Sequence, residues 1–467
     1  MDPADAYVQL CDALKSTVGS KLDDWSQRPD VEEAAGQVCE AVLADPNGLL
    51  PDHWVPDDVA PRPELLAVLL GLDHAMAHAR SDADRPDLRS LGYLRSRLLL
   101  TGRLNDNTSG SLLFRHRRSG RPISAPQTLD DLLHLVYIPP GSNIHVEPLA
   151  EADDLPDPGL NDDNQSEDPP TPPPIELAQL PFLAEPDDLQ WGDVNGRRSK
   201  YYTVQPHRSR LRVQPGAAVT ALCGCGASVA VLPEASLDGD LLVNWREALR
   251  NGPTSGDAGL SWLLIGTGPI GPPAHGDRYH NRAVLLSRKG EVLLAQDKQR
   301  GFPLPPEKQK DYGLHIGPPP PVHRDEYIAQ GTGLSLVESR YGRFGVHICE
   351  DVGWHRMRGD VITAGVTHLF VPVLSAPIQD AGWQAQMAME LVKEAGTDVA
   401  VSNGLAIARF NRNGGTPATT LLIVRVPPGH TDDNYLMPHQ MVRGYRSPLD
   451  PGEEARADAM KPRKASW

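Results

Sequence analysis

The segment GRFGVHICEDVGW, residues 342–354, is central to the fold because a short apolar run within it stops at a cysteine. Residues 344–348 are typical of a buried strand, and Cys349 follows them directly. Similar β-rich apolar runs recur between residues 201 and 426, and a helical stretch with one apolar face lies at residues 381–397. Strands interspersed with helices predict a layered α/β domain over residues 196–435.

Two other predicted strands also end at polar residues. The run at residues 228–233 stops at Glu234, and the run at residues 291–297 stops at Lys298. In layered α/β folds, strand ends bring side chains from distant parts of the sequence to one cleft. A nucleophilic thiol needs a nearby cation or a base that takes its proton. Glu234, Lys298 and Cys349 together therefore predict one site, although each alone is more typical of a turn carboxylate, a charged loop or a buried thiol.

The motifs around these residues, VAVLPEASLDG, EVLLAQDKQRG and GRFGVHICEDVGW, resemble the nitrilase, or carbon–nitrogen hydrolase, superfamily in kind and order. The cysteine motif is most similar to the glutaminase domain of glutamine-dependent NAD synthetases. The resemblance runs from Tyr201 to Gly429. It implies a four-layer αββα sandwich that forms a homodimer or higher homo-oligomer. It also implies Glu234 as the base, Lys298 as the oxyanion stabiliser and Cys349 as the nucleophile.

The resemblance points to further site residues. Family members often use a second glutamate between the lysine and the cysteine. Glu326 lies in the better context for this role, and Glu307, in a proline-rich insertion at residues 301–321, is the alternative. The expected substrate-binding residues are Glu350, Trp354 and Trp383. Because 38 residues follow Gly429, we expect no ATP-pyrophosphatase domain of the kind found in the synthetases.

The rest of the chain differs in composition. Apolar residues recur at helix spacing through residues 1–150, which predicts a mostly α-helical N-terminal domain. Residues 151–190 hold twelve Asp and Glu, nine Pro and no Lys or Arg, so we predict an acidic, proline-rich flexible linker over residues 151–195. Residues 436–467 are expected to form a C-terminal tail.

Charge and composition limit the classes of partner. The chain of 467 residues has 45 Lys and Arg against 61 Asp and Glu, a net charge of −16, which disfavours a general nucleic-acid binder. Seven arginines between Arg95 and Arg121 leave nucleic-acid contact as a minority alternative. Five scattered cysteines, an acidic start and no long apolar run predict a soluble cytoplasmic protein. Nucleotide-binding motifs and paired zinc ligands are missing from the sequence, so we expect no cofactor and no metal.

The leading functional hypothesis is a hydrolase of a linear, non-peptide amide-type C–N bond that acts through a thioester on Cys349 and releases ammonia or an amine. The cysteine context favours an amide over a nitrile as substrate. One alternative is a non-catalytic binding or scaffolding module built on a nitrilase-like fold. The other is an effector whose N-terminal domain senses a protein partner or nucleic acid and gates the hydrolase.

Overall fold

The computed structural model divides the chain into two compact units. The first comprises Met1–Ile144, Thr363–Gly365 and His430–Asp432, and the second His145–Ile362, Val366–Gly429 and Asp433–Trp467. The structure describes residues 3–45, 49–55, 60–81, 111–114, 129, 132–139, 141–148, 175–194, 200–253, 260–275, 277–309, 314, 323–339, 342–376, 378–379, 382–407, 419–424, 440–443 and 461–466. The predicted arginine patch therefore lies outside the described residues.

The first unit is mainly helical, as the sequence predicts. Its elements are α1 (Pro3–Leu14), α2 (Gly19–Ser26), α3 (Pro29–Ala44), a short 3-10 turn at Asp52–Trp54, α4 (Pro63–Ser81), and the strands β1 (Ser111–Phe114) and β2 (Leu135–Ile138). The two strands pair antiparallel, which the prediction of a helical domain did not include. Leu112 of β1 and Leu135 of β2 are buried in the same apolar cluster as the helices, and this burial stabilises the pair of strands.

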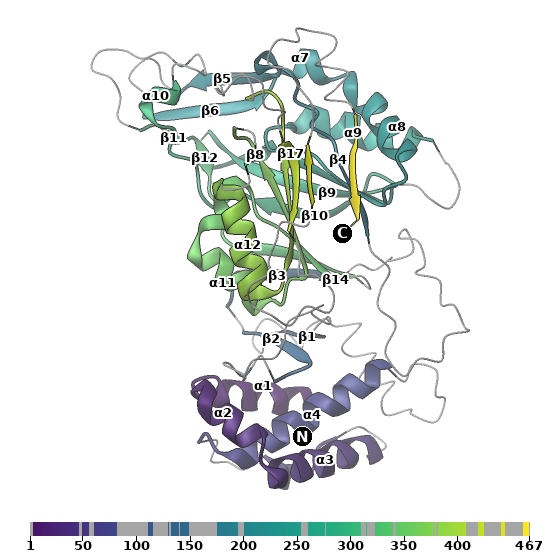
Figure 1. Cartoon of the computed structure of the whole chain (residues 1–467), viewed down its shortest axis with the longest axis vertical. Helices are drawn as coiled ribbons and strands as arrows, with labels where there is room; N and C mark the ends of the chain where they lie inside the picture. Colours follow the sequence, from purple (N-terminus) through teal and green to yellow (C-terminus); the bar gives the residue numbers. More distant parts are fainter. Residues whose placement is uncertain are drawn as a thin grey trace. The chain divides into compact units, whose positions relative to one another are not determined.

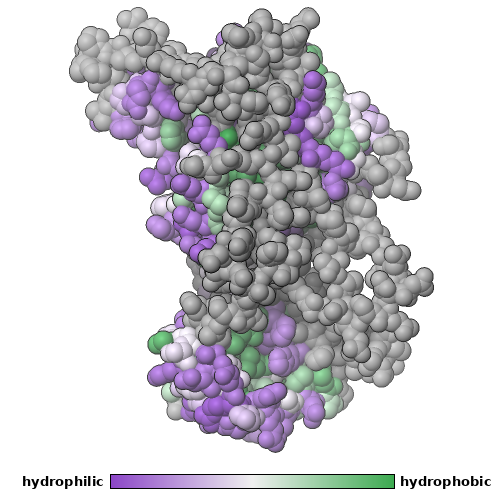
Figure 2. Space-filling model, in the orientation of Figure 1, coloured by the Kyte–Doolittle hydropathy of each residue, from purple (hydrophilic) through white to green (hydrophobic). Residues whose placement is uncertain are grey.

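Helices α3 and α4 pack tightly because of their side-chain spacing. In α3, Pro29 stands at the start and acidic residues occupy the first turn, both favourable at a helix N-terminus. Its buried residues, Val31, Ala35, Val38 and Val42, recur every three or four positions and form one apolar face. On α4, a Cβ at Gly71 would lie 2.6 Å from the Cβ of Val38, so only glycine permits this contact. The side of the first unit seen in the lower part of Figure 2 is mostly hydrophilic.

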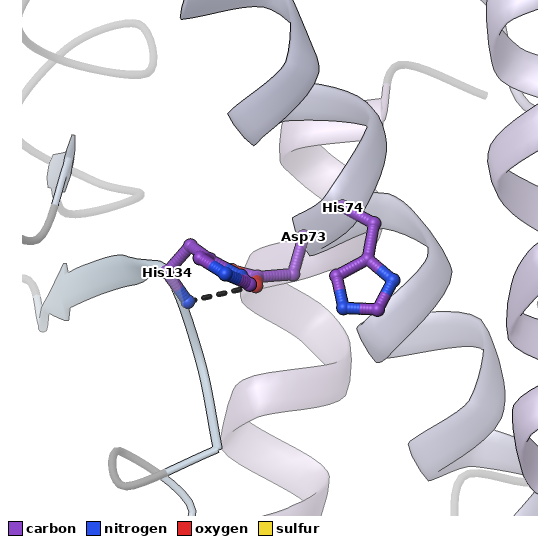
Figure 3. A group of neighbouring side chains, drawn as sticks. All are labelled: Asp73, His74 and His134. Atoms are coloured by element: carbon purple, nitrogen blue, oxygen red, sulfur yellow. Dashed lines mark hydrogen bonds and ion pairs between the residues drawn. The ribbon is translucent and has the colours of Figure 1, made fainter. Parts of the chain in front are cut away.

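A buried carboxylate links α4 to the start of β2. Asp73 is fully buried and accepts hydrogen bonds from the Tyr7 hydroxyl (3.1 Å) and the Leu135 amide (2.9 Å). Its other oxygen lies 2.7 Å from both the amide nitrogen and Nδ1 of His134. His74 completes a group whose ligand atoms lie within 4.8 Å of one another (Figure 3). Four hydrogen-bond contacts already surround the carboxylate, which accounts for its burial as a structural anchor.

Replacing this anchor is expected to cost stability. Asp73→Ala removes one acceptor from several buried donors, and a buried donor without an acceptor costs about 1–3 kcal/mol. We expect a loss of about 3 kcal/mol in the free energy of unfolding, measured by urea denaturation. His74→Ala, an exposed neighbour on the same helix, is the matched control and should change it by less than about 0.5 kcal/mol. Equal effects of the two variants would rule out the anchoring role.

The second unit contains two large sheets. In the first, the strand order is β10-β9-β8-β7-β4-β19, and β12 pairs with β9. In the second, it is β18-β17-β16-β15-β14-β13-β3. The strands of the first sheet are β4 (Glu176–Gln179), β7 (Val229–Val231), β8 (Trp262–His275), β9 (Arg278–Ser287), β10 (Val292–Asp297), β12 (Ile328–Ala329) and β19 (Arg463–Ser466). The strands of the second are β3 (Ile144–Pro148), β13 (Leu334–Ser339), β14 (Gly342–Val346), β15 (His368–Val373), β16 (Asp398–Asn403), β17 (Thr419–Val424) and β18 (Gln440–Arg443).

The two sheets face each other and helices cover their outer sides. Trp262 of β8 meets Phe344 of β14 edge to face, with ring centroids 5.1 Å apart, and the Gln179 side chain donates to the carbonyl of Asn403. Helices α8 (Gln214–Gly224) and α9 (Gly239–Asn251) lie on the first sheet, and α11 (His355–Thr363) and α12 (Trp383–Ala395) lie on the second (Figure 1). This arrangement confirms the predicted four-layer αββα sandwich.

A small third sheet adds to this sandwich. Strand β6 (Tyr201–Pro206) pairs antiparallel with β5 (Leu189–Asp193) and parallel with β11 (Asp325–Glu326). A one-turn helix, α7 (Arg208–Leu211), follows β6, a 3-10 turn at Pro186–Asp188 precedes β5, and another short helix, α10 (Pro306–Gln309), lies in the predicted insertion. Figure 1 shows this third sheet beside the strands of the sandwich.

The predicted linker and tail need correction. Residues 151–174 lie outside the described part, but residues 175–194 are not a linker, since β4 and β5 belong to sheets of the second unit. The prediction used the mean composition of residues 151–190, which is acidic although residues 175–184 form an apolar run. Phe182 and Leu183 in that run are fully buried. The tail, residues 436–467, contributes β18 and β19, and β19 pairs with β4. Within the described residues, no helix is both long and apolar enough to span a membrane.

Candidate active site

Glu234 lies just beyond the end of β7, a strand whose three residues are all buried. The chain turns sharply there, with Ala235 at a positive φ of 61°. Strand β8 approaches this turn so closely that a Cβ at Gly266 would lie 1.5 Å from the carbonyl oxygen of Pro233. Glycine at this position therefore lets the adjacent strand hold the Glu234 turn in place.

Lys298 directly follows β10, and its backbone amide donates to the carbonyl of Asn281 on β9. The hairpin that carries it was predicted from the break at residues 288–291, and the antiparallel pairing of β9 and β10 confirms that prediction. Gly290 supplies the turn with a φ of 72°. Lys298 is almost fully buried, and a buried ammonium requires charged or polar partners.

Cys349 follows β14 at the start of the 3-10 turn Cys349–Gly353. Its φ is 54°, in the left-handed region that is unfavourable for residues other than glycine. Such strain costs about 1–3 kcal/mol and is typical of functional positions. The turn directs the chain away from the sheet at the thiol, where the sequence pattern predicted that the apolar run stops.

The three strand ends meet, and Glu326 of β11 joins them. Lys298 Nζ lies 2.7 Å from Glu234 Oε1 and 2.7 Å from Glu326 Oε2. The Asn281 side-chain amide donates to both carboxylates, at 3.2 Å and 2.9 Å. The Cys349 thiol lines the same cavity as Glu234, and the carboxylate raises the pKa of the thiol. The structure thus brings together all four residues predicted for the chemistry, and Glu307 is exposed on α10 instead.

Backbone amides complete the binding of the two carboxylates. The Leu374 amide donates to Glu234 Oε2 at 3.0 Å, and the Phe302 amide donates to Glu326 Oε2 at 3.2 Å. These donors fix both carboxyl groups on the two sides of Lys298. The sequence did not predict Asn281 or the two amides, because their positions depend on the pairing of strands that are distant in sequence.

Burial changes the acid–base behaviour of the site. It raises the pKa of the Cys349 thiol well above its ordinary value, and the Glu234 carboxylate adds to this effect. Burial also raises the pKa of Glu234, although Lys298 opposes the shift. For Lys298, burial alone would lower the pKa, but Glu234 and Glu326 outweigh it and hold the pKa well above its ordinary value. The resting site therefore has a protonated thiol beside a carboxylate of increased basicity and a permanently charged ammonium.

A cavity of about 530 Å³ opens at these groups, a typical size for a small-molecule site. Glu350 and Trp383, two of the predicted substrate-binding residues, line it. Trp354 does not line it, and its ring centroid lies 6.0 Å from the Arg300 guanidinium. The cavity is also lined by Trp191, Tyr202, Val204, Phe302, Leu304 and Lys308.

Asp351 ties the cysteine turn to the lysine segment. Its carboxylate accepts the amides of Gln299 (3.1 Å) and Arg300 (3.0 Å), the two residues after Lys298. Burial raises its pKa to about 7, from an ordinary value of 3.8, although Lys298 and the two amides oppose the shift. The sequence placed Asp351 in the cysteine motif but assigned it no contact.

This shift predicts a pH dependence of stability. Because the pKa is raised in the folded state, the contribution of Asp351 to stability is fully present below pH 3.8 and is lost as the pH rises to about 7. In Asp351→Asn this loss is absent, whereas the other groups titrate as before. We expect the wild type to lose, relative to the variant, on the order of 3 kcal/mol between pH 4 and pH 8 in urea unfolding. Asp187→Asn, which is 81% exposed, is the control; parallel pH curves for Asp351→Asn and the wild type would contradict the assignment.

Comparison with known proteins agrees with this geometry. Residues 216–435 match the family model described as carbon–nitrogen hydrolase. All four clustered residues lie within this match. The similarity of the cysteine motif to NAD synthetase glutaminases stays a prediction.

Solved structures similar to the chain include an amidase from Nesterenkonia sp. AN1 that carries the acetamide moiety of fluoroacetamide on its active-site cysteine. It is 15% identical, and the match covers 55% of this chain and 85% of that one with a TM-score of 0.35. Another is Nit3 of Saccharomyces cerevisiae, a member of branch 10 of the nitrilase superfamily. It is 12% identical, with 56% and 86% covered and a TM-score of 0.37. No curated protein matches the chain.

Proposed function

We propose that the second unit hydrolyses a linear amide through a thioester on Cys349. The observation that carries the proposal is the buried hydrogen-bonded group Glu234–Lys298–Glu326 beside a protonated thiol, at the base of a cavity. A thiol in this state is a weak nucleophile unless a base removes its proton during attack. Glu234 lines the same cavity as the thiol, and burial raises its pKa, which supports its role as that base.

The first half-reaction forms the thioester. The sulfur of Cys349 attacks the amide carbon while Glu234 takes the thiol proton, and negative charge develops on the amide oxygen. The Lys298 ammonium stabilises this charge, as preorganised cations do in water-excluded sites. When the tetrahedral intermediate collapses, Glu234 passes its proton to the nitrogen, the C–N bond breaks, and ammonia leaves.

The second half-reaction returns the enzyme. Glu234 takes a proton from a water molecule, which attacks the thioester carbon. The C–S bond then breaks, the carboxylic acid leaves, and the sulfur regains its proton from Glu234. Glu326 keeps Lys298 charged and in position throughout, since it forms the second ion pair at 2.7 Å.

Ammonia release tests the proposal. We expect the full-length protein to release ammonia from at least one member of a panel of glutamine, asparagine and simple primary amides. A coupled enzymatic assay should detect the ammonia, and mass spectrometry should detect a transient acyl adduct on the protein in the same reaction. If neither ammonia nor an adduct appears with any amide, the hydrolase proposal is wrong and the non-catalytic binding module is favoured.

Removing residues 1–143, which leaves β3 in place, tests whether the first unit gates this activity. A change in the rate of ammonia release or in oligomeric state is expected if the gating alternative holds. An unchanged rate and an unchanged oligomeric state would contradict it.

A further inference from the structure

The cavity beside Cys349 is larger than a minimal amide requires. Its volume of about 530 Å³ lies within the range of sites that hold drug-sized ligands. Acetamide would fill a small part of this volume. The remaining space is therefore available to a further part of the substrate.

One side of the cavity is an apolar wall, which we define as Trp191, Tyr202, Val204, Phe302 and Leu304. Trp191 and Tyr202 stand on the neighbouring strands β5 and β6, with ring centroids 5.9 Å apart. The Tyr202 hydroxyl already donates to the carbonyl of Phe302 at 3.1 Å, so its polar end is used within the wall. Trp191, Val204 and Phe302 are only half-buried and retain apolar surface for a ligand to cover.

The apolar wall is joined to the reacting groups. Tyr202 is paired in register with Glu326 across β6 and β11. Phe302 reaches the same carboxylate through its backbone amide, at 3.2 Å. A substrate whose carbonyl meets Cys349 and Lys298 therefore has the apolar wall directly beside it.

The position of the wall in the sequence separates it from the shared chemistry. Trp191, Tyr202 and Val204 precede residue 216, where the family match begins, whereas Glu234, Lys298, Glu326 and Cys349 all lie inside that match. Phe302 and Leu304 lie in the proline-rich insertion. The wall thus comes from strands β5 and β6 and from the insertion, none of which carries one of the four reacting residues.

We propose that the apolar wall binds the uncharged apolar acyl chain of a primary amide, either an alkyl chain of several carbons or an aryl group. This inference rests on the proposed function, because it assigns the substrate class of the same site. Among the described residues, the charged side chains that line the cavity besides the four reacting residues are Glu350, adjacent to Cys349, and the exposed Lys308. A charged acyl end placed against the wall would lose its hydration, and the five wall residues offer it no charged partner.

A homologous series of substrates tests this assignment in the wild-type protein. From acetamide through butyramide to hexanamide, kcat/KM should rise about fourfold per methylene, the factor expected when each methylene is buried. Phenylacetamide should be a good substrate, and glutamine a poor one. A flat or falling series, or glutamine hydrolysed faster than hexanamide, would overturn the inference and leave the proposed function intact.

Variants locate the effect in the wall. Trp191→Ala should lower the ratio of kcat/KM for hexanamide to that for acetamide at least about tenfold, and Val204→Thr, which preserves shape and adds a hydroxyl, should lower it in the same direction. Val243→Ala, exposed on α9 and outside the cavity, should leave the ratio unchanged. An unchanged ratio in both wall variants would overturn the inference. If no amide is hydrolysed and Cys349 carries no adduct, the proposed function fails and this inference fails with it.

Discussion

Replacing Cys349 by alanine should reduce ammonia release at least about 10⁴-fold, because the alanine side chain cannot form the thioester. The other groups of the site remain, so a small residual rate from oriented water is expected. The free energy of unfolding should stay the same or rise, since alanine removes a buried thiol that faces a carboxylate. Steady-state ammonia assays at saturating amide, with urea unfolding in parallel, measure both effects.

The matched control is Cys225→Ala. Cys225 is half-buried at the end of α8, and its thiol donates to the carbonyl of Leu222 at 3.0 Å, away from the cavity. Its variant should retain wild-type activity. Activity that survives in Cys349→Ala, or that disappears equally in Cys225→Ala, would show that the nucleophile has been assigned wrongly.

Replacing Lys298 by methionine should have the second large effect. Methionine keeps most of the volume but leaves Glu234 and Glu326 close together in a buried site without their cation. Removing one partner of a buried ion pair costs about 3–5 kcal/mol of stability. The loss of one oxyanion stabiliser should also lower kcat about 10²–10³-fold. Urea unfolding and amide kinetics measure the two effects separately.

Two further variants distinguish these causes. Lys289→Met, in the exposed turn between β9 and β10, should change stability by less than about 0.5 kcal/mol. Adding Glu326→Gln to Lys298→Met removes one of the two stranded carboxylates, so it should recover part of the stability but none of the activity. A double variant as unstable as Lys298→Met alone would contradict the charge account.

Local sequence patterns predicted the part of the site that lies at strand ends. Glu234, Lys298 and Cys349 each follow an apolar run, and the structure places the three together with Glu326. Asn281 lies within β9 and Tyr202 within β6, so neither stands at the end of an apolar run, the pattern that predicted the other site residues. Their contribution follows from which strands become neighbours, a property of the whole fold.

The error over the linker has a related cause. A window of forty residues averaged a strongly acidic segment with a short apolar strand, and the average resembled a disordered chain. Strand β4 then pairs with β7 and β19, which come from distant parts of the sequence. The burial that stabilises it cannot be inferred from its neighbours along the chain.

Rapid-quench intact-mass spectrometry with peptide mapping tests the central claim most directly. Wild-type protein mixed with hexanamide and quenched in acid should gain the mass of the acyl group, located on the peptide that contains Cys349, before ammonia release reaches its steady rate. Ammonia release with the acyl mass on another residue, or with no acyl mass at any time, would contradict the account.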